Sequence, residues 1–475
     1  NAPKADESVP PSTYLFPNGH YCRTCGLPPA LDPETQHPDT QHPDTQHPEP
    51  RSAGTMNENI VVGVDIGTTK VCAVVAAEDE LNRVNILGVG VAPSDGLNRG
   101  VVVNIDRTVN AVRSAIEEAE RAAGVEVRSV IVGIAGDHVQ SFQSRGVVTI
   151  RSGEITQGDV QRLLQDTMHV AMPADREILH VIPQEFIVDG QDGVADPVGM
   201  SGVRLEANVH IITGLVSAAK NIYRCIEKSG FEVTDIVLEP LASSFSCLHG
   251  DEKEVGVALI DIGGGTTDIA VFEDNTIRHT AVIAVAGNKV TDDIRKGLGV
   301  MRDQAEQLKR QFGTALVDFA DETEQIQIPG IGGRPEKTIG RDTLAQVIQP
   351  RLEEILEIAA IEIKRSGYAR HLGVGCVLTG GGALIPGTAD LAAEVLGMEA
   401  RIGRPMGLSG GLVEEVSDPK YSTGVGLVLY GMRPEVIGGS TLSEDIEQHQ
   451  NGETVSGETL VNRIATRMKS WFDEL

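Results

Sequence analysis

The chain has few aromatic residues, few cysteines and no long apolar run. Aromatic residues make up 3% of its 475 positions, whereas 53 residues are glycine. This combination is typical of an α/β protein with tight loops and strands rich in valine and isoleucine. Six cysteines are too few for a disulfide scaffold, and Cys72, Cys225, Cys247 and Cys376 stand singly in apolar contexts, as in a reduced cytosolic protein. The missing run of ~18 apolar residues argues against an integral membrane protein.

Basic residues are also scarce relative to acidic ones. Forty lysines and arginines face 68 aspartates and glutamates, which gives a net charge of −28. Because phosphate groups repel such a chain, we do not expect nucleic acid as a partner. The 40% apolar and 23% charged residues are ordinary for a soluble globular protein and argue against disorder throughout.

The first 55 residues differ from the rest of the sequence. They are rich in proline, poor in isoleucine and valine, and repeat Thr-Gln-His-Pro-Asp from Thr35 onwards. Such a segment buries too little apolar surface to fold, so we expect a disordered leader, and it lacks the pattern of a signal peptide. Met56 is a candidate natural start. His20, Cys22 and Cys25 form only a weak zinc motif, since no second cysteine pair follows.

Residues 60–75 predict a β-hairpin whose tip can face a phosphate group. The first apolar strand pattern contains Asp65. Gly67, Thr68 and Thr69 form the turn, and an apolar pattern returns at Val71–Val75. Glycine allows close approach of the backbone, and N–H groups in such a turn can bind an anion. By itself this loop is also compatible with a plain hairpin turn.

The same pattern returns after Val257. An apolar strand leads to Asp261, three glycines and two threonines follow, and a second strand begins. The repetition indicates two similarly built halves whose loops meet around a nucleotide. Asp65 and Asp261 suit Mg²⁺, which is usually held through water because it keeps most of its hydration shell.

A third glycine cluster lies at residues 380–382, between an apolar strand pattern and a helical pattern from Thr388 to Leu396. Glycines at such a junction let a ligand lie against bare backbone. Upstream, Glu306 and Lys309 are three residues apart in a helical segment, so they share one face. Alone, this pair is compatible with a surface ion pair.

The last 18 residues predict an amphipathic helix that lies on a membrane surface. Arg463, Arg467 and Lys469 flank its apolar face, and Trp471 is the only tryptophan. Aromatic and basic residues in this arrangement favour an anchor in the membrane plane, and the apolar residues are too few to span a bilayer. A helix docked on the protein's own core is the alternative, but the polar linker before it favours the membrane. The apolar face comprises Leu460, Val461, Ile464, Met468, Trp471, Phe472 and Leu475.

Five longer motifs occur in order along the chain: His180–Phe186, Asp196–Leu205, Ile260–Ala270, Ala286–Asn288 and Tyr421–Leu427. With the glycine loops, they resemble the FtsA family of bacterial cell-division proteins, within the actin/Hsp70/sugar-kinase ATPase superfamily, from about Met56 to Leu475. The resemblance implies an α/β, actin-like ATPase fold. Two related halves would surround a nucleotide cleft, and an FtsA-type subdomain would be inserted in the first half.

The resemblance also implies the site residues. ATP and Mg²⁺ would be the cofactors, with Asp65 and Asp261 at the metal. Glu239 falls where the superfamily orients the attacking water, but this position varies within the family, so we expect at most a slow ATPase. Glu306 and Lys309 fall at contacts to adenine and ribose. The remaining ligands are Gly67, Thr68, Thr69 and Lys70 in the first loop, Gly263, Gly264, Gly265, Thr266 and Thr267 in the second, and Gly380, Gly381 and Gly382 in the adenosine motif.

The domain boundaries follow from the same comparison. The expected segments are a leader (1–55), the first half (56–134 and 214–243), the inserted subdomain (135–213), the start of the second half (244–290), its smaller subdomain (291–349), the rest of the second half with the return to the first (350–433), a flexible linker (434–457) and the membrane helix (458–475). Within the insert, residues 154–168 predict a helix, and 180–188 and 209–212 predict strands.

The implied function is that of a division protein on the cytoplasmic face of the cell membrane, at the division site. It would polymerise head to tail through the inserted subdomain, tie the C-terminal peptide of FtsZ to the lipid surface and contact later division proteins. Arg334, Lys337 and Arg341 form a basic cluster that is a candidate site for the acidic FtsZ peptide, with a solvated loop as the alternative.

Two other functions occur in the same superfamily. A sugar kinase or phosphatase would need a catalytic aspartate facing a substrate pocket, and we find no convincing candidate. An Hsp70-like chaperone would need a β-rich peptide-binding domain after the ATPase, whereas only a linker and one short helix follow. Neither of these two functions needs the C-terminal amphipathic helix.

Overall fold

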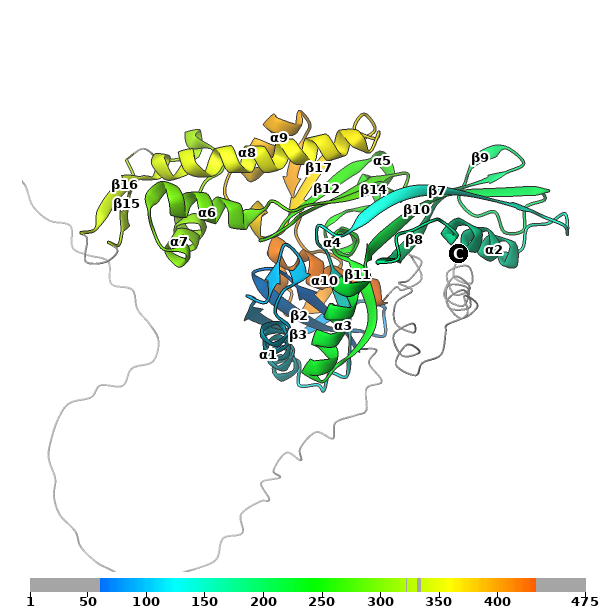
Figure 1. The fold of residues 1–475 in the computed structure, drawn as a ribbon, viewed down its shortest axis with the longest axis horizontal. Coiled ribbons are helices and arrows are strands. Elements are labelled where there is room, and N and C mark those ends of the chain that lie inside the picture. The colour runs from blue at the N-terminus through cyan, green and yellow to red at the C-terminus, as the bar shows by residue number, and fades with distance from the viewer. Residues whose placement is uncertain (1–59, 322, 331–334, 433–475) are drawn as a thin grey trace, which may run out of the picture. The chain divides into compact units, whose positions relative to one another are not determined.

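A computed structural model describes residues 60–321, 323–330 and 335–432 (Figure 1). The predicted leader, linker and C-terminal helix lie outside these residues, and so do the zinc motif and Arg334. Every element described below belongs to the unit Asn57–Leu475.

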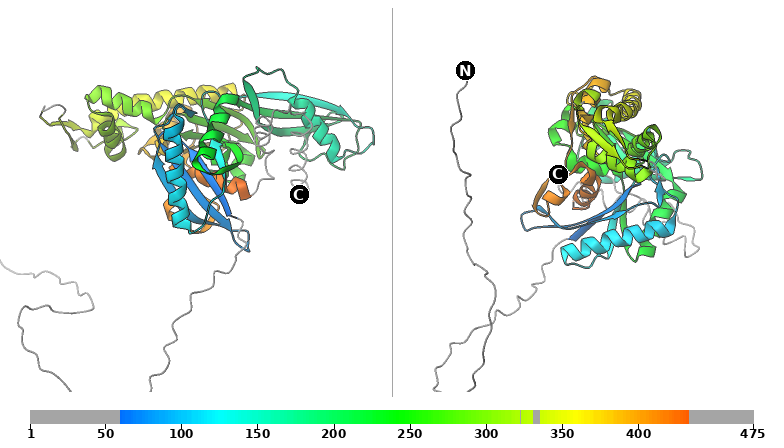
Figure 2. Two further views of the ribbon diagram at one scale, coloured as in Figure 1. Left: turned by 60° about the horizontal axis from the view of Figure 1, so that its bottom comes forward. Right: turned by 90° about the vertical axis from the view of Figure 1, so that its left-hand side faces the viewer.

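The first half is built on a six-stranded sheet. Its order is β11 (Glu232–Leu238), β6 (Ser129–Ile134), β1 (Ile60–Ile66), β2 (Lys70–Glu78), β3 (Val84–Pro93) and β19 (Leu408–Gly411). Strand β2 is buried on both faces, because α1 (Ile105–Ala123) and α10 (Ser422–Met432) both contact it. Figure 2 shows α1 running along this sheet. A small hairpin, β4 (Leu97–Asn98) and β5 (Val101–Val102), precedes α1.

The second half repeats the first. Its sheet has the order β14 (Thr276–Ile283), β13 (Thr267–Glu273), β12 (Val257–Ile262), β17 (Gly375–Thr379) and β18 (Ala400–Ile402). In both sheets the first hairpin is antiparallel, and its first strand pairs in parallel with the strand on its other side. The arrangement β14-β13-β12-β17-β18 thus matches β3-β2-β1-β6-β11, which confirms two similarly built halves.

Two helices join the halves. Helix α4 (Glu239–Cys247) contacts β6 and β11 of the first sheet and β12, β13 and β17 of the second, and the short α5 (Gly250–Val255) then leads into β12. Helix α10 crosses α4 so closely that a Cβ atom at Gly426 would lie 1.9 Å from the carbonyl oxygen of Ala242. Glycine is therefore required at this crossing.

The inserted subdomain consists of a four-stranded sheet and one helix. The sheet order is β7 (Gln140–Thr149), β10 (Arg204–Leu215), β8 (Arg176–Val188) and β9 (Gln191–Val194), and α2 (Gln157–Met168) packs on β7, β8 and β10. The predicted helix and strands of this region are confirmed, although β8 and β10 are longer than expected. Helix α3 (Val216–Ser229) then returns to the first half.

A smaller subdomain extends the second half. It contains α6 (Gly287–Leu298), α7 (Arg302–Phe312), η1 (Val317–Phe319), the hairpin β15 (Gln325–Ile328) and β16 (Lys337–Gly340), and the start of α8 (Arg341–Arg365). The remaining elements are η2 (Gly381–Leu384), α9 (Thr388–Leu396), η3 (Glu414–Val416) and η4 (Pro419–Tyr421). Within the described ranges, no helix combines the length and the apolar character needed to cross a bilayer.

Candidate functional site

The two predicted phosphate loops face each other. The first is the β1–β2 turn, and the second is the β12–β13 turn. A Cβ atom at Gly264 would lie 2.4 Å from Thr69 Cγ2, and one at Gly265 would lie 2.4 Å from Thr68 Oγ1. Residues almost two hundred positions apart therefore touch, and any larger side chain at either glycine would push the loops apart.

The second loop is held by the start of α6. The backbone N–H of Gly287 donates to the carbonyl oxygen of Gly263 at 3.1 Å, and that of Asn288 donates to Gly264 at 2.8 Å. In the first loop, Thr68 Oγ1 accepts from the backbone N–H of Gly100 at 3.3 Å. By contrast, the N–H groups of Gly264 and Gly265 donate to no acceptor within the described part of the chain. Such free donors in a glycine turn suit an anion.

Four acidic side chains gather beside the loops: Asp65, Asp261, Asp268 and Glu239. Lys70 Nζ pairs with Asp65 Oδ2 at 3.0 Å, so the first-loop lysine is already engaged. Asp261 Oδ2 accepts from Ser243 Oγ at 2.9 Å, and Thr266 Oγ1 donates to Asp268 Oδ2 at 3.1 Å. The other oxygen of Asp268 is buried and has no partner among the described residues.

The carboxylates perturb one another. Burial raises the pKa of Asp261 to about 6, and the neighbouring Asp65 adds to this rise. Burial and the surrounding carboxylates also hold the pKa values of Glu239 and Asp268 well above their ordinary values. Burial opposes the charge of Lys70, but its pairing with Asp65 outweighs this and raises the lysine pKa. The cleft thus holds more negative charge than its lysine compensates, a situation that a bound cation relieves.

Glu306 and Lys309 lie on α7 and face α6. Lys309 Nζ contacts Glu306 Oε2 at 2.7 Å, Thr291 Oγ1 at 3.0 Å and the carbonyl oxygen of Gly287 at 3.2 Å. Because Gly287 also bonds to Gly263, the pair lies next to the second phosphate loop. The lysine side chain is 12% exposed and that of Glu306 is 39% exposed, so the pair is partly buried, and its contact with adenine and ribose stays a prediction.

The third glycine cluster packs on the end of β12. Gly380 has a φ of +82°, and a Cβ atom there would lie 2.2 Å from Asp261 Oδ1. One at Gly382 would lie 2.4 Å from Ile262 Cγ2, whereas one at Gly381 would meet nothing within 4 Å. Gly380 therefore brings the loop against the Asp261 carboxylate and Gly382 brings it against Ile262, whereas Gly381 borders open space.

Sequence reasoning missed three polar residues of this site. Ser243 lies one helical turn after Glu239 on α4, Asp268 closes the second-loop motif, and Thr423 begins α10. Thr423 Oγ1 is 3.0 Å from Ser243 Oγ and 3.4 Å from Asp261 Oδ2. The i, i+4 spacing of Glu239 and Ser243 was a usable signal for one of them.

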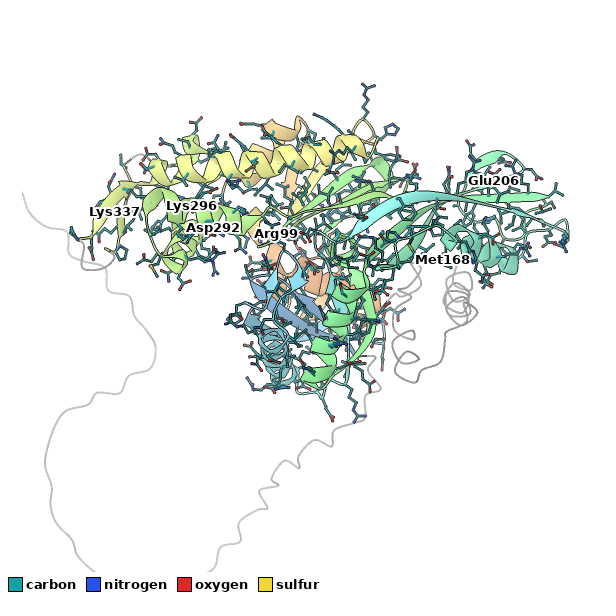
Figure 3. The ribbon with its side chains drawn as sticks, viewed as in Figure 1. Arg99, Met168, Glu206, Asp292, Lys296 and Lys337 are labelled. Carbon is teal, nitrogen blue, oxygen red and sulfur yellow. The ribbon has the colours of Figure 1, made fainter. Side chains whose placement is uncertain are left out.

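The predicted basic cluster is engaged in internal contacts. Lys337 Nζ, labelled in Figure 3, contacts the carbonyl oxygen of Leu298. Arg341 Nε donates to the carbonyl oxygen of Phe312 at 3.0 Å, and its Nη1 pairs with Glu324 Oε2 at 2.8 Å. Both side chains thus hold the β15–β16 hairpin and α8 to α6 and α7, and a partner-binding role for them stays a prediction.

A separate cavity of about 430 Å³ lies between η1, α8 and α9. Its lining includes Phe319, Gln349, Pro350 and Glu394 but no residue of the glycine loops or the acidic cluster. The loops, where free N–H donors and carboxylates lie together, are therefore the candidate nucleotide site, and this cavity is separate from them.

Comparisons with known proteins show the family of the chain. The family model for "Cell division protein FtsA" matches residues 258–426, and the model for "SHS2 domain inserted in FTSA" matches residues 136–213. The chain is 43% identical to the cell division protein FtsA of Pseudomonas aeruginosa over 88% of this chain and 99% of that one, and 39% identical to that of Escherichia coli over 88% and 97%. A solved PilM–PilN type IV pilus biogenesis complex shares the fold, with a TM-score of 0.57 and 15% identity over 78% of this chain and 98% of that chain.

Proposed function

Because the chain belongs to the FtsA family of cell-division proteins, we propose that it binds ATP between its two glycine loops and acts as the membrane anchor of a division polymer. Its fold is the actin-like ATPase fold with the FtsA-type insert, and this fold implies nucleotide binding. The observation that carries the proposal is the contact of Gly264 and Gly265 with Thr69 and Thr68. Phosphate groups there would accept hydrogen bonds from the backbone N–H groups of Gly264 and Gly265, which donate to no acceptor within the described residues.

Mg²⁺ would accompany the phosphates. Within the described residues, no cluster of three or more side chains could hold a metal ion by itself. Mg²⁺ commonly binds through one or two carboxylates, water and phosphate oxygens, which is the arrangement that Asp65 and Asp261 can serve. The unpartnered oxygen of Asp268 and the raised carboxylate pKa values support a cation at this position.

The nucleoside would extend towards Gly381 and α7. A Cβ atom at Gly381 would meet nothing within 4 Å, so a flat group would find room against the backbone there, and Lys309 contacts Gly287 beside the second loop. Lys309 is fixed by three contacts, so it would meet the ligand in a defined orientation.

Glu239 would orient the attacking water. It begins α4, directly after β11, and its side chain packs against Gly133, where a Cβ atom would lie 2.9 Å from Glu239 Cγ. Burial and the neighbouring carboxylates raise its pKa well above the ordinary value, and a bound cation would favour its charged form.

The division role adds three further contacts. Head-to-tail association through the inserted subdomain is supported by its exposed apolar side chains Phe142, Val147 and Val203, which are 36%, 47% and 63% exposed. The smaller subdomain at 291–349 would bind the C-terminal peptide of FtsZ, and later division proteins would join. Residues 458–475 would hold the assembly on the cytoplasmic face of the cell membrane at the division site, weakly as single helices and tightly in a polymer.

Sedimentation with lipid vesicles tests the anchor. The full chain with ATP should sediment with vesicles that contain anionic lipid, whereas Trp471→Glu should remain in the supernatant and still bind ATP. Leu81→Glu is the matched control, because Leu81 is a 69% exposed apolar residue outside the helix and should sediment like the unmodified chain. Unchanged sedimentation of Trp471→Glu would place the anchor elsewhere.

A further inference from the structure

The inserted subdomain bonds to the second half as well as to the first. Three of its strands each contribute one polar side chain to β14, the edge strand of the second sheet. Ser141 Oγ on β7 donates to the carbonyl oxygen of Thr280 at 2.9 Å, and His210 Nε2 on β10 lies 3.1 Å from Thr280 Oγ1. Gln184 Nε2 on β8 donates to the carbonyl oxygens of Ile277 and Arg278 at 2.8 and 3.1 Å.

These contacts are buried and specific. Gln184, His210 and Thr280 are 8%, 1% and 4% exposed. The pairing of β8 with β10 shifts register between Glu185 and Pro183, so Gln184 has no partner opposite it. The pairing of β14 with β13 likewise skips Arg278. A bulge on each strand thus turns Gln184 towards β14, and bulges commonly re-aim a side chain in this way.

The same strand reaches the first half. His180 lies four residues before Gln184 on β8, and its Nε2 accepts from the backbone N–H of Leu238 at 3.0 Å. Leu238 directly precedes Glu239 at the start of α4. The motif His180–Phe186 therefore contacts the first half through His180 and the second half through Gln184.

Strand β14 connects this contact to the second phosphate loop. Gln184 and His210 bind the strand at residues 277–280, and the strand ends at Ile283, which pairs with Thr267. Thr267 Oγ1 donates to the carbonyl oxygen of Val285 at 2.8 Å, and Gly287 then bonds to Gly263 at 3.1 Å. A continuous series of bonds thus joins the loop, strand β14 and the insert.

We propose that strand β8 couples the nucleotide cleft to the inserted subdomain: a shift between the halves on nucleotide binding moves β14 relative to Leu238, and β8, bonded to both, moves the insert. The inference rests on the proposed nucleotide site. It gives the motif His180–Phe186 a role outside the cleft, and it makes the exposed face of the insert responsive to the nucleotide. Such a coupling is reciprocal, so contacts of the insert also alter nucleotide affinity.

Hydrogen exchange measured by mass spectrometry tests this coupling. The full chain is compared without nucleotide, with ADP and Mg²⁺, and with a non-hydrolysable ATP analogue and Mg²⁺. We expect nucleotide to slow exchange in residues 263–268 and to change the exchange rate of residues 176–188 and 204–215 at least threefold. In Gln184→Leu the loop protection should remain while the change in the insert falls by more than half. Gln191→Leu, on the exposed strand β9, is the control and should behave like the unmodified chain.

The outcomes separate the two proposals. Protection of residues 263–268 without any change in the insert would overturn the coupling and leave the nucleotide site standing. No protection at residues 263–268 would remove the nucleotide site and the coupling with it. If the exchange rates of the insert still change fully in Gln184→Leu, the hydrogen bonds of Gln184 to β14 do not carry the coupling. If that variant does not fold, Thr280→Val removes the hydroxyl group that contacts His210 at nearly constant volume and must show the same loss of response.

Discussion

Asp261 links the pH dependence of stability to the nucleotide cleft. Its pKa is about 6 in the folded protein, against an ordinary 3.8, so the folded chain binds more protons than the unfolded chain between these values. The contribution of this group to the free energy of unfolding therefore falls as pH rises from about 4 to 6, by about 3 kcal/mol at most.

Asp261→Asn should remove this loss of stability at higher pH. Without nucleotide or Mg²⁺, we expect the variant to have a higher free energy of unfolding than the unmodified chain at pH 7.5 and a smaller advantage at pH 4. Urea denaturation at both pH values measures this, with the exposed Asp318→Asn as control. An equal gain in the free energy of unfolding at both pH values would mean that burial does not raise the pKa of Asp261.

Glu239 should separate hydrolysis from binding. Glu239→Gln keeps the size of the side chain and removes its ability to accept a proton, and such a loss typically costs 10²–10⁴-fold in rate. We expect phosphate release to fall at least tenfold from an already slow rate, whereas ATP affinity in calorimetry changes less than threefold. Unaltered phosphate release would exclude Glu239 from positioning the water.

Individual side chains differ in how well the sequence predicts them. The proximity of Asp65 and Asp261 to the loop glycines was predictable, because the repeated strand-turn-strand motif brings them to two matching turns, whereas their roles at a metal ion and a nucleotide stay predictions. Ser243 and Thr423 were not, since a buried hydroxyl group that holds a carboxylate looks like any helical serine or threonine. Lys70 pairs with Asp65, and its expected contact with a phosphate stays a prediction.

Helix α10 depends on one glycine where it crosses α4. Gly426→Ala would place a Cβ atom 1.9 Å from the carbonyl oxygen of Ala242, and overpacking of this kind costs about 1–3 kcal/mol. We expect a lower melting temperature. Gly297→Ala on α6 is the control, because its Cβ atom would meet Val347 at an ordinary 3.5 Å and a helical alanine is favoured by up to about 1 kcal/mol. A melting temperature of Gly426→Ala at or above that of the unmodified chain would contradict the close crossing.

Helices and strands with strong periodicity were predicted well. The hairpin β1–β2, the hairpin β12–β13 and the helix Thr388–Leu396 follow the expected pattern. Strand β7 was not anticipated, because its first six residues are exposed or half-buried and all but Phe142 are polar, so they present no apolar face. The bulge at Gln184 also left no signal, since it depends on the register between two strands and not on local composition.

The arrangement of the two halves follows from the repeated loop motif, but the position of the insert does not. The spacing of the motifs indicated an extra segment in the first half. Nothing in the order of the residues indicated that Ser141, Gln184 and His210 would meet one strand of the second half, because those contacts join residues 70 to 139 positions apart.

Calorimetric titration with ATP and Mg²⁺ tests the central claim, a nucleotide site between the two loops. Gly264→Ala would place a Cβ atom 2.4 Å from Thr69 and separate the loops, whereas a Cβ atom at Gly250 would meet nothing within 4 Å, so Gly250→Ala is the matched control. We predict that Gly264→Ala remains folded and loses at least tenfold in ATP affinity, while Gly250→Ala binds like the unmodified chain. Equal affinity in all three proteins would contradict a phosphate site between these loops.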